Sequence, residues 1–167
     1  AAQVTEEDQE LILWRLRKIA HDANRQIAEE HNLEPSANVT ALKPEGTLSL
    51  VFGGVSPGVH ASHAPYYIRR IRISATDPLV KVCEELGWNV KNEVGQEGDE
   101  INTKVVEFPV RSPATKTKSK FSAVEQLNVY KMFQTNYTDQ NTSITVTVAD
   151  NEWEEVEEWL WENWNIF

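Results

Sequence analysis

The stretch 43–47 (KPEGT), with Ser49 close behind it, carries the clearest chemical pattern in the sequence. A proline-glycine turn that leads into a helix leaves backbone NH groups without partners, and the helix dipole favours negative charge at that end. Gly46 lets a ligand approach the backbone closely, and Thr47 and Ser49 add hydroxyl donors. The pattern indicates a site for an anion such as a phosphate. Backbone amides would bind it while the carboxylate of Glu45 points away.

A plain turn before a core helix explains the same residues, and from residue types alone this interpretation is slightly favoured. The wider stretch 41–60 holds four of the chain's seven glycines, which suits either interpretation. Gly53 and Gly58 have the spacing of a Walker A loop, but Val59 and His60 stand where that motif has lysine and a hydroxyl residue. The dinucleotide-binding pattern G-x-G-x-x-G is also missing from the sequence. The choice between a turn and a phosphate site stays open at this point.

Three arginines follow the glycine-rich stretch, within a run of strand-forming residues. Side chains alternate along a strand, so Arg70 and Arg72 are expected on one face and Arg69 on the other. Arginines in this position could screen a triphosphate, although ion pairs with nearby acids are the commoner use. The lysines of residues 116–120 are most simply explained as a solvated loop.

Metal and thiol chemistry receive little support. His60 and His63 form an H-x-x-H pair, but no third ligand is evident, so we expect no metal site. Cys83 is the only cysteine, which excludes an internal disulfide and a cysteine-rich zinc site. A single small thiol on an amphipathic helix is usually a core residue, and we assign Cys83 no catalytic role.

The composition bounds the class of protein. The chain has 167 residues, of which 40% are hydrophobic and 25% charged, as in one ordinary soluble domain. Its net charge of −10 argues against general binding to nucleic acid. No apolar run approaches the roughly 18 residues that a membrane helix needs, so we expect no membrane association. The single cysteine suits the reducing cytoplasm, where we expect the protein to act.

Hydrophobic periodicity and turn residues set the expected elements. We expect helices over 6–31, 76–86, 122–134 and from 150 or 151 onward, and strands over 39–42, 66–73, 88–90, 103–110 and 142–148. Thr5 opens a capping box for the first helix, and Pro78 and Gly87 mark the start and the end of the second. Strands that alternate with helices favour a layered α/β fold with parallel pairing.

The last helix raises a packing problem. Its start is assigned to Asp150 or Asn151, and the side chains expected on one common face are those of Trp153, Val156, Leu160 and Trp164. The tryptophans of residues 153–164 fall all around this helix, so no single face can bury them. Another segment of a longer protein could cover the rest.

Longer segments then resemble a known family. The runs ALKPEGTLSLVFGGVSPGVH (41–60) and YYIRRIRIS (66–74) are followed by TKVVEFPV (103–110), AVEQLNVYKMFQTNYTDQNTSITVTV (123–148) and an acidic helix. In this order they resemble the adenosylcobalamin-dependent (class II) ribonucleoside-triphosphate reductases. That family has a loop K-P-(S or E)-G-T, then S-P-G-V-H, then Y-Y-I-R-R. The likeness covers nearly the whole chain.

The resemblance implies a fold and a site. It implies a partial ten-stranded α/β barrel, with residues 1–167 as a single fragment that holds late strand-helix units of the reductase barrel. The family's P-(S or E)-G-T loop holds the phosphates of the substrate, which implies phosphate binding here by Glu45, Gly46 and Thr47, with Ser49 as a further donor. The accessory candidates are Lys43, His60 and Arg70. Because of this resemblance, we prefer a phosphate site to a plain turn for residues 43–49.

The resemblance also implies a function. The family converts ribonucleoside triphosphates to 2′-deoxy products for DNA replication, using adenosylcobalamin, a cysteine thiyl radical and a dithiol reductant such as thioredoxin. The radical motif N-x-C-x-E and a reducing cysteine pair are missing from this sequence. We therefore expect the chain to act with the remainder of a reductase and to be inactive alone. The alternative is a non-catalytic nucleotide- or partner-binding module derived from that barrel, with the tryptophan-rich acidic tail as its interaction surface.

Overall fold

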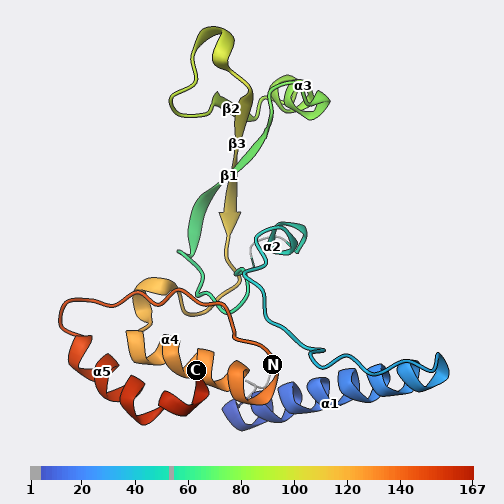
Figure 1. Cartoon of the computed structure of the whole chain (residues 1–167). Helices are drawn as coiled ribbons and strands as arrows, with labels where there is room; N and C mark the ends of the chain where they lie inside the picture. Colours follow the sequence, from blue (N-terminus) through green and yellow to red (C-terminus); the bar gives the residue numbers. More distant parts are fainter. Residues whose placement is uncertain (1–4, 53–54) are drawn as a thin grey trace.

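The three longest helices gather at one end of the molecule, and a narrow β arm rises from them (Figure 1). The computed structural model describes residues 5–52 and 55–167. Its elements are α1 (Glu6–Glu30), α2 (Leu48–Val51), β1 (Tyr66–Ser74), α3 (Pro78–Glu85), β2 (Asn89–Asn92), η1 (Gly98–Glu100), β3 (Thr103–Arg111), η2 (Lys118–Lys120), α4 (Ala123–Asn136), α5 (Trp153–Glu162) and η3 (Trp164–Ile166). The mixed α/β content agrees with the prediction. Within the described ranges, no helix combines the length and the apolar character needed to cross a bilayer.

Local capping signals fix the helix ends as the sequence predicts. The Thr5 hydroxyl accepts a hydrogen bond from the backbone NH of Asp8 at 3.1 Å, and the Asp8 carboxylate accepts from the backbone NH of Thr5 at 3.2 Å. The Asp77 carboxylate caps α3 through the backbone NH of Leu79 at 2.9 Å. Gly87 follows α3 with a φ of +75°, a conformation that favours glycine at the end of a helix.

The sheet corrects the expectation of parallel pairing. Its strand order is β1-β3-β2, and β3 is antiparallel to both neighbours, with Tyr66 opposite Arg111 and Asn89 opposite Glu107. The connection between β2 and β3 spans only residues 93–102. Parallel neighbours need a crossover of about a dozen residues or more, so a link of this length closes an antiparallel pair. The sheet therefore forms the arm seen in Figure 1 rather than a layer covered by helices.

The main core lies between α4 and α5 in the helical base. Its buried members are Ala123, Leu127 and Tyr130 of α4 with Val156 and Trp159 of α5. The predicted inner face of the last helix is wrong in part, because Trp153 and Trp164 are 60% and 75% exposed. The expectation that no face buries all the tryptophans is confirmed. The predicted cap is also wrong, because Glu152 occupies the N-cap position of α5.

Two predicted strands have no strand partner in the described chain. Residues 39–42 and 142–148 carry no strand assignment. The alternation expected in the second segment is nevertheless present, with Ile144, Val146 and Val148 packed against the core. The side-chain amide of Gln126 bonds both the backbone carbonyl (3.2 Å) and the backbone NH (3.3 Å) of Thr147, as a neighbouring strand would. A sequence pattern can make a segment strand-like, but only a partner makes it a strand.

The two ends of the glycine-rich stretch pack against each other. Gly58 has a φ of +59°, and the backbone carbonyl oxygen of Lys43 lies 2.6 Å from the place where a Cβ of residue 58 would stand. A side chain at this position would therefore collide with backbone. The glycine thus holds the start of the KPEGT stretch against the S-P-G-V-H stretch.

We expect Gly58→Ala to lower the free energy of unfolding by more than about 2 kcal/mol, measured by urea denaturation. The left-handed conformation alone costs a non-glycine residue about 1–2 kcal/mol, and the contact with Lys43 adds to that cost. Gly98→Ala is the matched control, since Gly98 has a φ of +56° but nothing within 4 Å of its added Cβ. Equal losses in the two variants would contradict the packing of Lys43 against Gly58.

Candidate functional site

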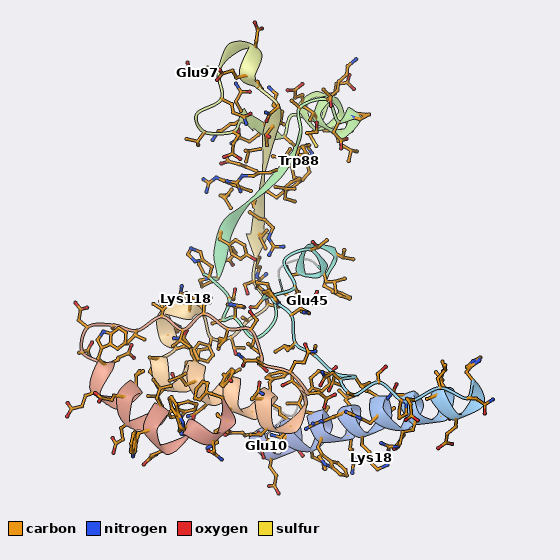
Figure 2. The ribbon with its side chains drawn as sticks, viewed as in Figure 1. Glu10, Lys18, Glu45, Trp88, Glu97 and Lys118 are labelled. Carbon is orange, nitrogen blue, oxygen red and sulfur yellow. The ribbon has the colours of Figure 1, made fainter. Side chains whose placement is uncertain are left out.

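The KPEGT loop stands at the foot of the β arm, immediately before the short helix α2 (Figure 2). Gly46 and Thr47 are exposed, whereas Ser49 is buried. The backbone NH of Ser49 donates to the carbonyl oxygen of Glu45 at 3.1 Å, and the Ser49 hydroxyl donates to the carbonyl oxygen of Gly46, also at 3.1 Å. The hydroxyl of Ser49 is thus occupied within the loop, where it braces the turn.

The amides at the centre of the loop are free to bind a ligand. Among the described residues, the backbone NH groups of Gly46 and Thr47 have no hydrogen-bond acceptor. A Cβ added at Gly46 would meet nothing within 4 Å, so space is open on that side of the backbone. The loop therefore presents donors to solvent instead of using them in internal packing.

Two of the accessory candidates belong to the packed ends of the glycine-rich stretch. Lys43 opens the KPEGT loop, and His60 ends the S-P-G-V-H stretch that packs on it. The side chain of Lys43 is exposed, and its backbone touches Gly58. The Nδ1 atom of His60 lies 2.8 Å from the carbonyl oxygen of Pro57, and because a carbonyl only accepts, Nδ1 is the protonated ring nitrogen there. The structure thus brings Lys43 and His60 to the two packed ends of the glycine-rich stretch.

Arg70, the third accessory candidate, is engaged elsewhere. Its Nε atom lies 2.8 Å from the carboxylate of Glu107 on β3, which also pairs with Lys91 at 3.0 Å. The hydrogen bond from Lys91, and then that from Arg70, lowers the pKa of Glu107. Arg72 pairs with Glu93 on the same side of the arm. Of the two uses left open for the three arginines, Arg70 and Arg72 thus show the commoner one, an ion pair with a nearby acid.

Arg69 is the arginine that reaches α2, directly after the loop, and it is not among the accessory candidates selected from the sequence. Its Nη1 atom donates to the backbone carbonyl of Ser49 at 3.3 Å, and its Nη2 atom donates to the hydroxyl of Tyr67 at 3.0 Å. The guanidinium carbon also lies 5.7 Å from the centroid of the Tyr67 ring. Alternation along β1 predicted that Arg69 and Arg70 face opposite ways. Only the packed structure shows which face meets α2.

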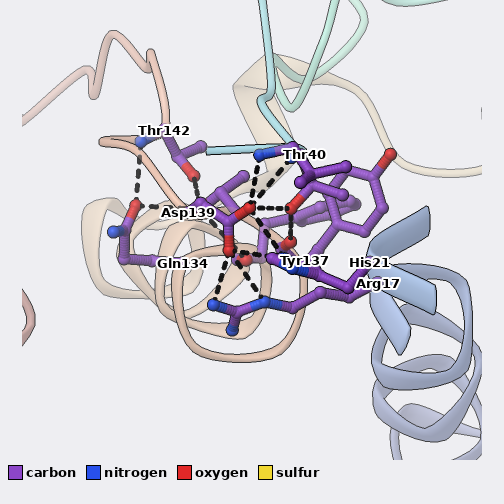
Figure 3. Close-up of polar contacts among 10 residues, drawn as sticks. Arg17, His21, Thr40, Gln134, Tyr137, Asp139 and Thr142 are labelled. Carbon is purple, nitrogen blue, oxygen red and sulfur yellow. Dashed lines mark hydrogen bonds and ion pairs between the residues drawn. The ribbon is translucent and has the colours of Figure 1, made fainter. Parts of the chain in front are cut away.

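A buried carboxylate anchors the chain that leads into the loop (Figure 3). The side chain of Asp139, just beyond α4, is only 6% exposed. Its Oδ1 atom accepts from Arg17 at 2.7 Å, its Oδ2 atom lies 2.9 Å from Nε2 of His21, and both of these residues belong to α1. Oδ2 also accepts from the backbone NH groups of Val39 at 2.8 Å and Thr40 at 3.0 Å. One carboxylate therefore ties the first helix and the end of α4 to the segment before the loop.

The electrostatic consequence is a strongly acidic Asp139. Burial by itself raises the pKa of this carboxyl, but the hydrogen bonds from the backbone NH groups of Thr40 and Val39, and then those from Arg17 and His21, outweigh burial and hold the pKa well below its usual value. Asp139 is therefore ionised at neutral pH, in the state that its donors require.

Other chemistry is sparse in the described chain. Within residues 5–52 and 55–167, no three histidine, cysteine, aspartate or glutamate side chains gather as a metal site would need. The thiol of Cys83 is half-buried on α3, in the distal part of the β arm (Figure 1). The site is thus one of backbone amides, hydroxyls and cations.

A fold of this kind occurs in B12-dependent (class II) ribonucleotide reductases. A crystal structure of such an enzyme matches 92% of this chain with a TM-score of 0.77 and 28% sequence identity, over 22% of its own length. No family model matches the chain.

The sequence relatives narrow the relationship. The chain is 34% identical over 140 residues to the adenosylcobalamin-dependent ribonucleoside-triphosphate reductase of Lacticaseibacillus paracasei, which covers 81% of this chain. It is 34% identical over 146 residues to the enzyme of the same name from Lactobacillus acidophilus, which covers 84% of this chain. The matched regions are 18% and 19% of those relatives, so the chain spans about a fifth of their length. The chain is homologous to one segment of the adenosylcobalamin-dependent ribonucleoside-triphosphate reductases, as its motifs predicted.

The anchoring role of Asp139 predicts a pH-dependent variant. We expect Asp139→Asn to lower the free energy of unfolding at pH 7 by about 2–3 kcal/mol, because Arg17 loses its charged partner and the NH groups of Val39 and Thr40 lose a charged acceptor. The pKa of Asp139 is lower in the folded chain than its usual value near 4, so its contribution is complete above about pH 5 and is lost as the pH falls below that. The stability difference between wild type and variant should therefore shrink from pH 5 to pH 3 in urea titrations.

The exposed Asp150 provides the control for this comparison. Asp150→Asn should change stability by less than about 0.5 kcal/mol at every pH, as substitutions on open surface usually do. A loss at Asp139→Asn no larger than that at Asp150→Asn would contradict the anchoring role.

Proposed function

We propose that this chain supplies the phosphate-binding end of the active site of an adenosylcobalamin-dependent ribonucleoside-triphosphate reductase. That enzyme would convert ribonucleoside triphosphates to 2′-deoxyribonucleoside triphosphates. The observation that carries the proposal is the exposed loop Glu45–Thr47, whose central amides have no acceptor among the described residues. Homology to one segment of such reductases supports it.

The loop is braced in a way that suits anion binding. Lys43 rests on Gly58 before the turn, and the Ser49 hydroxyl holds the carbonyl of Gly46 after it. Arg69 adds a hydrogen bond to the carbonyl of Ser49. Donors that are already in place need no costly rearrangement when a charged ligand arrives. Backbone amides of Gly46 and Thr47, with the Thr47 hydroxyl, would therefore hold the phosphates.

The contribution of this chain to the reaction is positioning. Fixing the anionic tail of a nucleotide also fixes where its ribose lies, and correct placement of reacting groups is worth several kcal/mol of a barrier. The loop would thus present the ribose to chemistry carried by other parts of the enzyme.

We assign no binding site for adenosylcobalamin, the cofactor in the relatives' name, to the described residues. When bound in a reductase, adenosylcobalamin supplies the radical on a cysteine, yet the only thiol here, Cys83, is half-buried on α3, in the β arm beyond the loop. We therefore assign the cofactor and the radical cysteine to the remainder of the reductase chain. A dithiol reductant such as thioredoxin would act there too.

The remainder of the reductase would also supply strand partners for two segments of this chain. Residues 39–42 and 142–148 pair with no strand in the described ranges. As late strands of a ten-stranded α/β barrel, they would find neighbours in the missing parts of that barrel. Side chains such as that of Gln126 occupy part of their backbone until then.

A second candidate function has one observation in its favour. The exposed fractions of Trp153, Trp161 and Trp164 on the last helical segment are 60%, 84% and 75%. Exposed aromatic side chains in such density are typical of an interaction surface. A non-catalytic nucleotide- or partner-binding module would use that surface, whereas in the reductase it would pack against another part of the enzyme.

The loop assignment predicts unequal effects of two substitutions. Gly46→Val should weaken binding of a ribonucleoside triphosphate at least about tenfold, because the branched side chain blocks close approach and charge-assisted hydrogen bonds are worth about 1.5–3 kcal/mol each. Lys43→Ala should weaken it less than about fivefold, because one exposed charge contributes about 0–1 kcal/mol. Isothermal titration of the purified chain measures both.

The structure makes Gly46→Val a clean variant. Its added Cβ meets no protein atom within 4 Å, and the φ of Gly46 lies outside the left-handed region. The far-ultraviolet circular dichroism and the urea midpoint should therefore match wild type. Equal effects of the two substitutions on binding, or a larger effect of Lys43→Ala, would count against the loop.

A further inference from the structure

A concave surface lies where the 56–63 segment meets β1 and η2. It is a cleft of about 330 Å³ at the foot of the β arm. Its lining comprises residues of the 56–63 segment, Tyr67 and Arg69 of β1, Lys118 of η2, Gln126 of α4 and Thr145. An adjoining cleft of about 280 Å³ shares His60, Ser62 and Thr145 with it.

The cleft is basic although the chain as a whole is acidic. The chain carries a net charge of −10, yet none of the described residues that line this cleft is acidic. Arg69 and Lys118 contribute cations to its wall, and within the described chain neither has a carboxylate partner. Lys116, in the adjoining cleft, is by contrast paired with Glu125 at 2.5 Å. Two uncompensated cations therefore face one concave surface.

Internal hydrogen bonds hold the walls of the cleft in place. The backbone NH of Lys118 donates to the carbonyl of Ser62 at 2.7 Å, and Ser62 forms a parallel bridge with Thr117. The buried hydroxyl of Ser62 donates to that of Ser112 at 2.7 Å. The basic loop is solvated at Lys118 and Lys120, as the sequence suggested, but its backbone is also bonded to Ser62, with Lys118 at the foot of the arm (Figure 2).

Arg69 connects the cleft with the KPEGT loop. It lines the cleft, and its Nη1 atom also donates to the carbonyl of Ser49, four residues beyond Glu45. A planar guanidinium can hold two oxygens of a phosphate at once, whereas a lysine acts as a point charge. Arg69 therefore touches both the cleft and the carbonyl of Ser49, which lies two residues beyond Thr47.

We propose that this cleft is the subsite for the outer phosphates of a nucleoside triphosphate, with Arg69 and Lys118 as the residues that select a triphosphate over a diphosphate. The proposal rests on the proposed function, since the nearer phosphate lies on the KPEGT loop. A diphosphate fills the loop but leaves the cleft cations without a partner. The third phosphate brings the charge that they attract.

Inorganic tripolyphosphate and pyrophosphate test this selection on the purified chain by isothermal titration. Wild type should bind tripolyphosphate at least about tenfold more tightly than pyrophosphate, since one further charge-assisted contact is worth about that factor. Arg69→Gln and Lys118→Gln should each remove most of this preference. Arg69→Lys should restore part of it, because the charge returns without the guanidinium fork.

The matched controls are the neighbouring cations outside the cleft. Arg70→Gln and Lys120→Gln remove the same charge from the same elements, but neither residue lines the cleft. Both should leave the preference within about twofold of wild type. An equal loss in the controls would mean that diffuse charge attracts the anion, and it would overturn the subsite.

The loop and the cleft can fail separately. Loss of binding of both anions in Gly46→Val, with an unchanged preference in Arg69→Gln and Lys118→Gln, would overturn the subsite and leave the loop standing. Loss of preference in the cleft variants, with normal pyrophosphate binding in Gly46→Val, would support the subsite and overturn the loop. No preference in wild type would overturn the subsite outright.

Discussion

The carboxylate of Asp139 is the interaction on which the candidate site depends. It accepts hydrogen bonds from Arg17 of α1 and from the backbone of Thr40, and it follows directly on α4. Thr40 stands five residues before Glu45, so the path of the chain into the loop begins at this carboxylate. A buried charge needs several donors to be stable, and these donors come from separate segments. The charge therefore forces α1, the end of α4 and the approach to the loop into one arrangement.

The charges and hydrogen-bond donors around the candidate site favour an anionic ligand. Acidic side chains are dense in the last helix, whereas the loop offers free amides at Gly46 and Thr47, and the guanidinium of Arg69 bonds the carbonyl of Ser49 just beyond it. A protein with net charge −10 can thus hold an anion, because attraction is decided by charges close to the ligand and distant ones are screened over about 8–10 Å. Homology to a segment of ribonucleoside-triphosphate reductases gives that anion its proposed identity.

Local features could be predicted from the sequence because local energies decide them. The Thr5 box, the proline start of α3 and the alternation of Ile144, Val146 and Val148 all depend on residues within one or two turns of chain. Pairing could not be predicted in the same way. The 142–148 segment has strand character, but in the described structure no strand lies beside it, and the direction of the sheet followed from the short link after β2.

The site was predictable only in part for the same reason. The loop was found because glycine, proline and hydroxyl residues signal free amides locally. Arg70 was selected instead of Arg69, and only tertiary packing shows that Arg69 bonds Ser49, directly after the loop. The account is tested most directly by a ¹H–¹⁵N NMR titration of the chain with a ribonucleoside triphosphate. It predicts that the amide signals of Gly46 and Thr47 shift most. Unchanged signals at both residues, with shifts confined to α5, would contradict it.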